Sequence, residues 1–516
     1  MYGVTMDRLN YLKWCKTAGL SERALKTHRI YDYMPGHVRY QCGTYPVRVP
    51  YYPTEEDWRL LDRYVENGIS AIHLWFWNGE CGLFGRDVYE PVNKDGLRRF
   101  IHECHRRRLK VIPYTSPGYL DMHSPTYRPE WSRGVGSGWA SHMELDRLCP
   151  GSLSWRTYFY GAIERLMDDY GFDGIYWDGG MWLHNPGCFN KMAHDHIHFA
   201  DIERQDDVQL DKNTKLNVIN PDFADLWNDF MCGVYARVKD RGGFVVAHIS
   251  GDQISPFKDK SWDYQLMGEA KASIDILASI DKTKMVDPYV LRFIDWSKLI
   301  TNYEQGDFTP KLDLVPEIEH FAMACCIPYL QFPWLEDGGF GDEDMFTVPG
   351  VKYNEDDYWY KWAKAQQAKG FNPAIMGGSF VQGRDRFLDY FRVYRQMTEP
   401  NTVLYMEVKE KNGGRFPGTN GKRRVSVFVN SSLWVAIANM EEKTQEIKVR
   451  PLEGDGRECK VTLSSKALTV LRYYDMNSLP EIIQLTEKTS HALLPTTMTQ
   501  HPDIGSNAPA QETFNE

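Results

Sequence analysis

A short apolar segment that ends on a carboxylate and two glycines constrains the fold of this chain most: GFDGIYWDGG, residues 171–180. Alternate residues of a strand share a face, so Gly174, Tyr176 and Asp178 lie on one side. A helical pattern precedes the segment, over about residues 154–170. Helix, short turn and strand form the repeating unit of an α/β barrel, whose chemistry takes place where the strands end. We therefore interpret Asp178 as a catalytic candidate; the alternative is a helix cap or an ion pair.

The same alternation of strands and helices continues on both sides of this segment and predicts a (β/α)8 TIM barrel. Predicted helices cover residues 54–67, 94–108, 154–170 and 222–243, and predicted strands cover residues 38–47, 71–77, 109–115, 172–178, 244–249, 262–269, 327–332 and 374–376. The loops after the third, fourth, sixth and seventh strands exceed about 15 residues, a length typical of functional loops. We expect a lead-in helix within residues 1–35 and the catalytic barrel over residues 36–399.

After residue 399 the pattern changes to short alternating runs separated by Gly and Asn turns. Closely spaced strands with such turns are typical of a small antiparallel β-sandwich, which we place at residues 400–476. We expect it to brace the barrel, with carbohydrate binding as the alternative. The tail at residues 477–516 is polar and is expected to be disordered.

The composition of the chain indicates which kinds of molecule it can bind. The net charge of −10 disfavours nucleic acid and anionic membranes. There is no run of about 18 apolar residues, and the N-terminus lacks the apolar core of a signal peptide. The chain as given is expected to be cytoplasmic, or secreted or periplasmic if a leader was removed. Sixteen Trp and 30 Tyr suit the binding of sugar rings by flat aromatic faces.

A second carboxylate ends the predicted strand at residues 262–269. If this strand is continuous, Asp263, Gln265 and Glu269 share a face and point inward. Asp178 and Glu269 on one rim would flank a glycosidic bond, where one carboxylate attacks or activates water and the other protonates the leaving oxygen. A structural ion pair is the alternative for Glu269.

The segment Phe172–Asp178 resembles the fourth-strand motif of retaining TIM-barrel glycosidases, which include the α-galactosidase and α-glucosidase clans and the α-fucosidases. The order of a barrel and then a β-sandwich, over roughly residues 36–475, resembles the layout of these enzymes too. The resemblance implies that Asp178 is the nucleophile and that Glu269 is the acid/base. The chain departs from the first two clans, which usually place Asp at the acid/base position.

Further polar and aromatic residues near predicted strand ends are candidates to bind the substrate: Trp77, Asn78, Glu80, Tyr114, His248, Asp252, Trp334 and Glu336. Core packing is an alternative for Trp77 and His248. Glu336 is the second candidate for the acid/base, and Asp252 also lies within reach of His248.

No metal or other cofactor is expected. His194, His196 and His198 alternate, but no cysteines at metal-binding spacing support them, and the chemistry of two carboxylates requires no metal. We interpret the chain as a retaining glycosidase acting on an oligosaccharide or glycoside, with α-linked sugars preferred. An inverting glycosidase or transglycosylase on the same scaffold, and a non-catalytic carbohydrate-binding barrel, are the alternatives. The sequence does not predict the oligomeric state.

Overall fold

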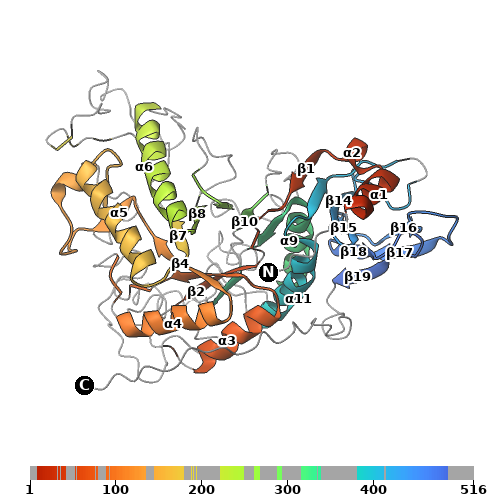
Figure 1. The fold of residues 1–516 in the computed structure, drawn as a ribbon, viewed down its shortest axis with the longest axis horizontal. Coiled ribbons are helices and arrows are strands. Elements are labelled where there is room, and N and C mark those ends of the chain that lie inside the picture. The colour runs from red at the N-terminus through yellow and green to blue at the C-terminus, as the bar shows by residue number, and fades with distance from the viewer. Residues whose placement is uncertain are drawn as a thin grey trace, which may run out of the picture.

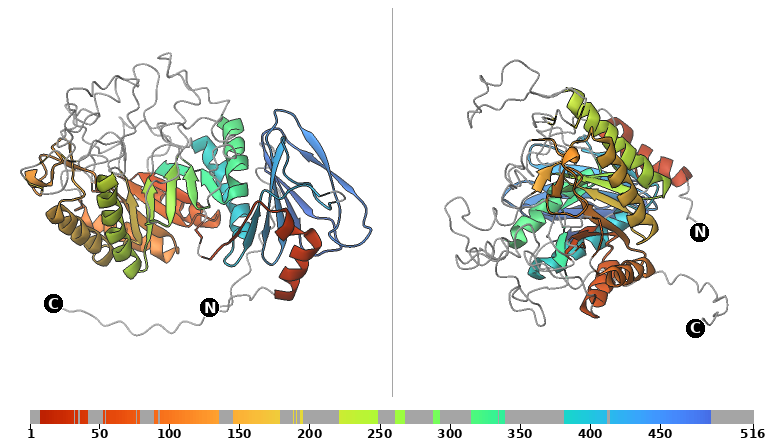
Figure 2. Two further views of the ribbon diagram at one scale, coloured as in Figure 1. Left: turned by 90° about the horizontal axis from the view of Figure 1, so that it is seen from above. Right: turned by 90° about the vertical axis from the view of Figure 1, so that its left-hand side faces the viewer.

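The computed structural model shows a barrel of parallel strands beside an antiparallel β domain (Figure 1). Apart from some positions inside these ranges, it describes residues 8–41, 53–78, 89–134, 145–178, 188–194, 221–248, 261–267, 288–292, 315–338 and 381–485. Figure 2 shows the same two parts from two further directions, with the β domain beside the barrel.

The barrel sheet contains nine strand segments, paired in parallel in the order β11-β10-β9-β8-β7-β4-β3-β2-β12. They are β2 (His37–Gln41), β3 (Ala71–Trp75), β4 (Lys110–Thr115), β7 (Gly174–Trp177), β8 (Phe244–His248), β9 (Tyr264–Met267), β10 (Val290–Arg292), β11 (Gln331–Pro333) and β12 (Leu335–Gly338). One residue separates β11 from β12, and these two segments pair with β10 and with β2. They act as one interrupted eighth strand, so the pairing returns to the first strand. The predicted (β/α)8 barrel is confirmed.

The last two barrel strands differ from the expectation. The seventh strand is β10, which lies in a stretch that we interpreted as a loop, and the run at residues 327–332 leads into the eighth strand. Its first residues form a 3-10 helix, Ile327–Tyr329. The strand β10 has only three residues, too few to show the period of two that identifies a strand in a sequence. The expected strand at residues 374–376 lies outside the described residues.

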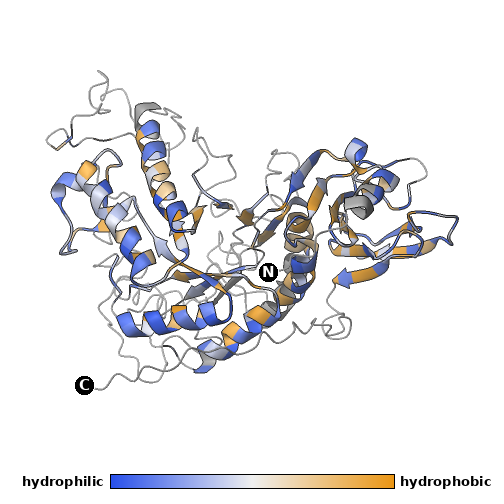
Figure 3. Ribbon diagram, viewed as in Figure 1, coloured by the Kyte–Doolittle hydropathy of each residue, from blue (hydrophilic) through white to orange (hydrophobic). Residues whose placement is uncertain are grey.

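Helices α3 (Glu55–Glu66), α4 (Lys94–Arg106), α5 (Leu153–Asp168) and α6 (Pro221–Asp240) connect the first five strands, and α9 (Val315–Cys326) and α11 (Val381–Met397) lie at the β domain (Figure 1). Each helix contains both hydrophobic and hydrophilic residues, as Figure 3 shows. In α4, Leu97, Phe100, Ile101 and Cys104 are buried at helical spacing, and the Asn93 side chain caps its start by accepting from Gly96 N at 2.9 Å. None of the described helices is both long and apolar enough to cross a membrane.

Gly174 holds β7 close to β8. Its φ is +146°, and a Cβ at this position would lie 1.8 Å from the carbonyl oxygen of Phe244. No other residue type fits this approach without moving the backbone. The close packing of β7 on β8 therefore requires the glycine of the Phe172–Asp178 segment.

The C-terminal domain is a six-stranded antiparallel sheet covered by a hairpin, which confirms the predicted sandwich. Its strands are β1 (Lys26–Arg29), β13 (Val403–Met406), β14 (Arg423–Val429), β15 (Leu433–Asn439), β18 (Leu468–Tyr473) and β19 (Glu481–Leu485), and the hairpin consists of β16 (Gln445–Val449) and β17 (Cys459–Leu463).

Both ends of the chain differ from what we expected. The lead-in contains α1 (Arg8–Ala18) and α2 (Leu20–Arg23), and then β1, which pairs with β13 of the C-terminal sheet. The tail, expected to be disordered from residue 477, supplies β19, which pairs with β18. Both are edge strands, and the hydrogen-bonding edges of β13 and β18 provide partners that local sequence does not reveal.

The central strands of the six-stranded sheet are buried on both faces. In β15, Trp434, Ala436 and Ala438 pack into the core that includes α9 and the barrel, and Leu433 and its alternate neighbours pack beneath the hairpin. This alternation joins the domain to the barrel through an apolar layer, with α9 and α11 between them (Figure 1).

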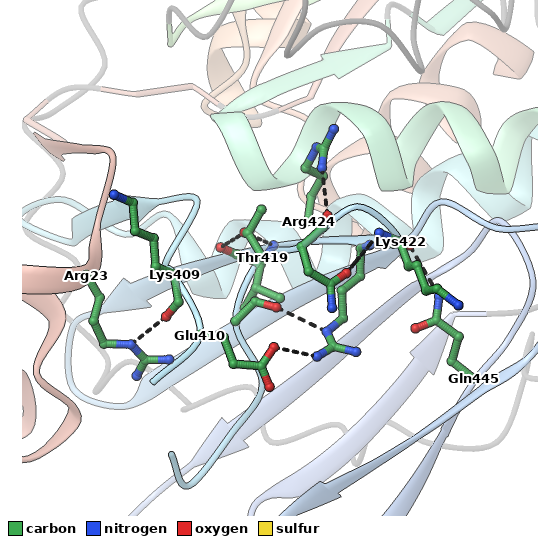
Figure 4. A network of polar contacts seen from close by, with 11 residues as sticks. Arg23, Lys409, Glu410, Thr419, Lys422, Arg424 and Gln445 are labelled. Carbon is green, nitrogen blue, oxygen red and sulfur yellow. Dashed lines mark hydrogen bonds and ion pairs between the residues drawn. The ribbon is translucent and has the colours of Figure 1, made fainter. Parts of the chain in front are cut away.

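A network of polar contacts joins α2 and β14 of this domain to the segment at Lys409 and Glu410, as Figure 4 shows. Arg23 of α2 donates to the carbonyl oxygen of Lys409 at 2.7 Å, and Arg423 donates to Glu410 at 2.9 Å. A neighbouring groove of about 560 Å³ is lined mainly by charged side chains, and its one aromatic lining residue, Phe416, is only 3% exposed. The groove therefore lacks an exposed ring on which a sugar would stack.

Candidate active site

Asp178 follows β7 directly, at the end of the barrel where the parallel strands finish. Its backbone N–H donates to the carbonyl oxygen of Thr115 at 2.9 Å, which continues the pairing with β4. Its side chain is 21% exposed. The carboxylate is thus held on the rim of the barrel and still reaches solvent.

Two neighbouring side chains orient the Asp178 carboxylate. The hydroxyl of Tyr114 on β4 donates to Oδ2 at 2.6 Å, and Nδ1 of His248 on β8 lies 3.1 Å from Oδ1. The same Nδ1 lies 2.7 Å from the hydroxyl of Tyr176. An ionised carboxylate only accepts hydrogen bonds, so Nδ1 carries the proton when it bonds to Asp178. One donor on each oxygen fixes the plane of the carboxylate.

Aromatic rings pack inside the barrel beside these groups. Ring centroids of Tyr114 lie 4.3 Å from Trp75 and 5.5 Å from Tyr176, which stacks on it. The Arg39 guanidinium lies over the Trp75 ring at 3.5 Å. A planar cation on an indole face is attracted by the ring quadrupole and is held with little freedom. The interior near the rim is therefore aromatic and carries a fixed positive charge.

A histidine pair fills the opposite, inner part of the barrel. Nδ1 of His37 lies 2.8 Å from Nε2 of His73, and both side chains are fully buried. Burial lowers the pKa of His37 to about 3 and lowers the pKa of His73 well below its usual value. Both imidazoles are neutral near pH 7, so one donates to the other.

The inward direction of Asp263 and Gln265, on which the choice of Glu269 rested, is wrong. Asp263 points to the helical layer, where Lys239 of α6 reaches it at 3.1 Å. Tyr264 is the residue that points into the barrel, among its aromatic rings. A shift of one residue in the facing of a strand reverses every side chain, which explains the error. Glu269 itself lies outside the described residues.

The other predicted site residues divide into two groups. Trp77 is 3% exposed, its indole N–H donates to the Tyr114 carbonyl at 2.9 Å, and its ring contacts Phe172. This is the packing of a core residue, the alternative considered above. Asn78 beside it is buried too. Of the predicted binding residues, Tyr114 and His248 contact Asp178.

The remaining candidates have no described side chain. Glu80, Asp252 and Trp334 lie outside the described residues, as does Glu269. Glu336 lies on β12, where its backbone is in register with Arg39 of β2. The partner carboxylate of Asp178 therefore stays a prediction, with Glu269 and Glu336 as its candidates.

Arg39 and Tyr176 belong to the site but were not predicted as such. A signal for Arg39 is present in the first strand, where His37, Arg39 and Gln41 alternate with apolar residues. In an exposed strand this pattern marks the solvent side. In a closed barrel it marks a polar interior.

A second cluster of polar side chains lies near the loops that follow β4 and β7. Among the described residues, Cys149, Cys188 and His194 have ligand atoms that all lie within 4.8 Å of one another. We expected no metal near His194 because no cysteine spacing supported one, but the structure brings two cysteines to this histidine. Cys188 lies six residues before His194, but Cys149 lies 39 residues before Cys188, so spacing in the sequence did not reveal the cluster.

Comparisons with known proteins bear on the fold. The sequence matches no protein-family model and no curated protein. Solved structures do match: an Anoxybacillus alpha-amylase, at 13% identity and a TM-score of 0.52, covers 86% of this chain and 99% of its own. The alpha-amylase of Geobacillus thermoleovorans has 13% identity, a TM-score of 0.48 and coverage of 85% and 98%. An alpha-galactosidase of Geobacillus stearothermophilus has 12% identity and a TM-score of 0.45, and the match covers 85% of this chain and 55% of its own. At such identities, the likeness to the Anoxybacillus protein shows a common fold.

Proposed function

We propose that this chain is a glycoside hydrolase that cleaves α-linked glycosidic bonds with retention of configuration, and that Asp178 is its nucleophile. The observation that carries the proposal is the carboxylate of Asp178 at the end of β7, held by Tyr114 and His248 beside an aromatic interior. A carboxylate on this rim is in the position where barrels of this kind perform chemistry.

The fold supports the same class of reaction. The Anoxybacillus protein is named an alpha-amylase and is described as giving insight into a new glycosyl hydrolase subclass. Its fold alone does not carry the activity over, because barrels of this type host many functions. The support comes from the fold together with the constrained carboxylate.

In the proposed reaction, one oxygen of Asp178 attacks the anomeric carbon while an acid protonates the leaving oxygen. The resulting glycosyl-enzyme is then hydrolysed by water, which the same acid/base group deprotonates. Tyr114 and His248 hold the nucleophile in the plane of attack. We assign the acid/base to Glu269 on the resemblance to retaining TIM-barrel glycosidases alone, with Glu336 as the second candidate. Retention requires this carboxyl group at about 5–5.5 Å from Asp178, and inversion about 6.5–9.5 Å.

A substrate screen tests the activity. The full chain is assayed against nitrophenyl α- and β-glycosides of several sugars, and the anomer released first is identified by proton NMR. We expect turnover of an α-glycoside with the α-anomer as the first product. Release of the β-anomer would indicate an inverting enzyme, and new glycosides would indicate transglycosylation. Binding of sugars without turnover of any substrate would favour the non-catalytic barrel and refute the proposal.

Two aspartates that flank β7, Asp173 and Asp178, provide a matched pair of variants. Asp178→Asn should reduce kcat on the order of 10³-fold or more, because no other group replaces a nucleophile. Asp173→Asn changes a carboxylate five residues earlier, which is bonded to Lys110 at 2.7 Å at the other end of the strand. It should retain kcat. Equal losses in both variants would mean a structural effect.

Azide identifies the nucleophile independently of rate. In Asp178→Gly, azide fits the space of the lost carboxylate and attacks an activated α-glycoside from the opposite face. The expected product is the β-glycosyl azide. Absence of this product, with a variant that is folded by circular dichroism, would count against Asp178.

The acid candidates are separated by the leaving group of the substrate. Loss of the acid slows substrates with poor leaving groups far more than activated ones. The ratio of kcat on an activated substrate to kcat on an unactivated one is therefore compared between Glu269→Gln and Glu336→Gln.

A further inference from the structure

The cluster of Cys149, Cys188 and His194 joins two segments that lie on the same side of the barrel. Cys149 follows β6 (Leu145–Arg147), between β4 and α5, and Cys188 and His194 follow Asp178 in the chain. Both cysteines are buried, and His194 is half-buried. We propose that these three side chains bind one zinc ion, which holds the segment after β7 to the segment after β4.

The histidine is already oriented as a ligand. Its Nε2 lies 2.8 Å from the carbonyl oxygen of Glu130, which only accepts, so Nε2 carries the proton. The neutral ring therefore presents a lone pair at Nδ1, and this atom faces the Cys188 sulfur at 3.0 Å. Donation of the second ring N–H to a backbone carbonyl is the usual arrangement around a metal-bound histidine.

The ligand atoms are close to the spacing that zinc requires. Zinc lies at about 2.3 Å from sulfur and about 2.0–2.1 Å from nitrogen, so a tetrahedral site holds a sulfur and a nitrogen about 3.6 Å apart. The Cys188–His194 contact opens by roughly half an ångström to reach this value. Three protein ligands leave one position for water. Two sulfurs and an imidazole select zinc over calcium or magnesium, which prefer oxygen.

Burial raises the pKa of the Cys149 thiol, and a neighbouring cation opposes this shift. The guanidinium of Arg133 is 1% exposed and lies near enough to interact electrostatically with both thiols. A neighbouring cation favours the thiolate form that binds metal. Two thiolates neutralise the charge of the ion, so the loaded site does not place a net positive charge beside Arg133.

Backbone contacts hold the same two segments together. The Asn190 side chain, between Cys188 and His194, donates to the carbonyl oxygen of Ser132 at 3.0 Å. The N–H groups of Ala193 and His194 both donate to the Asn190 carbonyl, which forms the turn that carries the histidine. His194 thus sits on a preformed turn, and the ion would cross-link this segment to Cys149, starting ten residues after the candidate nucleophile.

Metal content of the full chain tests the site. The protein is produced with zinc in the medium, purified without chelator or metal-affinity steps, and analysed by plasma mass spectrometry. We expect about one zinc per chain. Cys188→Ser should lower the content more than about tenfold. Cys459→Ser, which removes a partly exposed cysteine of β17, is the matched control and should keep the zinc.

Cobalt and thermal unfolding keep the test independent of any single variant. Wild-type protein stripped of metal should take up cobalt with a thiolate charge-transfer band and the visible bands of a tetrahedral site, and added zinc should raise its Tm. His194→Gln should retain the thiolate band and alter the visible bands. Zinc-free protein that shows no thiolate band with cobalt would overturn the proposal. A Cys149–Cys188 disulfide found by peptide mapping of fresh protein would overturn it too. Neither outcome depends on glycosidase activity.

Discussion

The buried pair of His37 and His73 should make this protein unstable in mild acid. Burial lowers the pKa of His37 from 6.5 to about 3, and the pKa of His73 is also well below 6.5. Between these values the unfolded chain binds protons that the folded chain excludes. Stability is therefore lost as the pH falls below about 6.5, and it is fully present above that value.

The size of the effect follows from the pKa difference. Each unit corresponds to 1.36 kcal/mol, so 3.5 units give His37 about 5 kcal/mol between pH 6.5 and pH 3. At pH 5 the loss is 1.5 units, about 2 kcal/mol for this histidine, and the lowered pKa of His73 adds a loss of the same sign. This is a large fraction of a total stability of about 5–15 kcal/mol.

Urea unfolding followed by circular dichroism at constant ionic strength, between about pH 7.5 and about pH 5, measures this loss. His73→Gln keeps a hydrogen-bond partner for His37 but cannot titrate, so the slope of stability against pH should fall. The slope is compared rather than the absolute stability, because the smaller side chain also loses packing. His102→Gln, at an exposed position of α4, is the control and should keep the wild-type slope. A wild-type slope in His73→Gln would refute the argument.

Three further changes test other parts of the structure. Gly174→Ala should destabilise the fold by more than about 3 kcal/mol, measured by urea unfolding, because its Cβ would collide with the Phe244 carbonyl; a loss below about 1 kcal/mol would mean that β7 and β8 separate easily. Tyr114→Phe should lower kcat/KM by roughly 10–100-fold at nearly unchanged Tm, through loss of its bond to Asp178; unchanged kinetics would show that this bond does not serve the reaction. Leu404→Lys on β13 should lower Tm by several degrees, because a charge would enter the layer between the β domain and the barrel, whereas Lys409→Ala at an exposed position should not.

The local sequence determined the two-domain architecture and the position of the candidate nucleophile, Asp178. The period of two in Phe172–Asp178 and the helical pattern before it gave a barrel strand, the inward face and the position of Asp178 at the rim. The turns after residue 399 gave the antiparallel domain. These features depend on neighbours within a few residues, and the sequence reports such contacts directly.

Tertiary structure alone decided which distant groups meet. β10 is a strand because its neighbours β9 and β11 supply hydrogen bonds to three residues, and β1 belongs to the C-terminal sheet because β13 offers an open edge. The facing of Asp263 was fixed by the register of β9 on β8. Likewise, Tyr114 reaches Asp178 across 64 residues, and Cys149 reaches Cys188 across a helix and a strand. Such meetings are set by strand register and barrel closure, which involve the whole sheet and leave no local period in the chain.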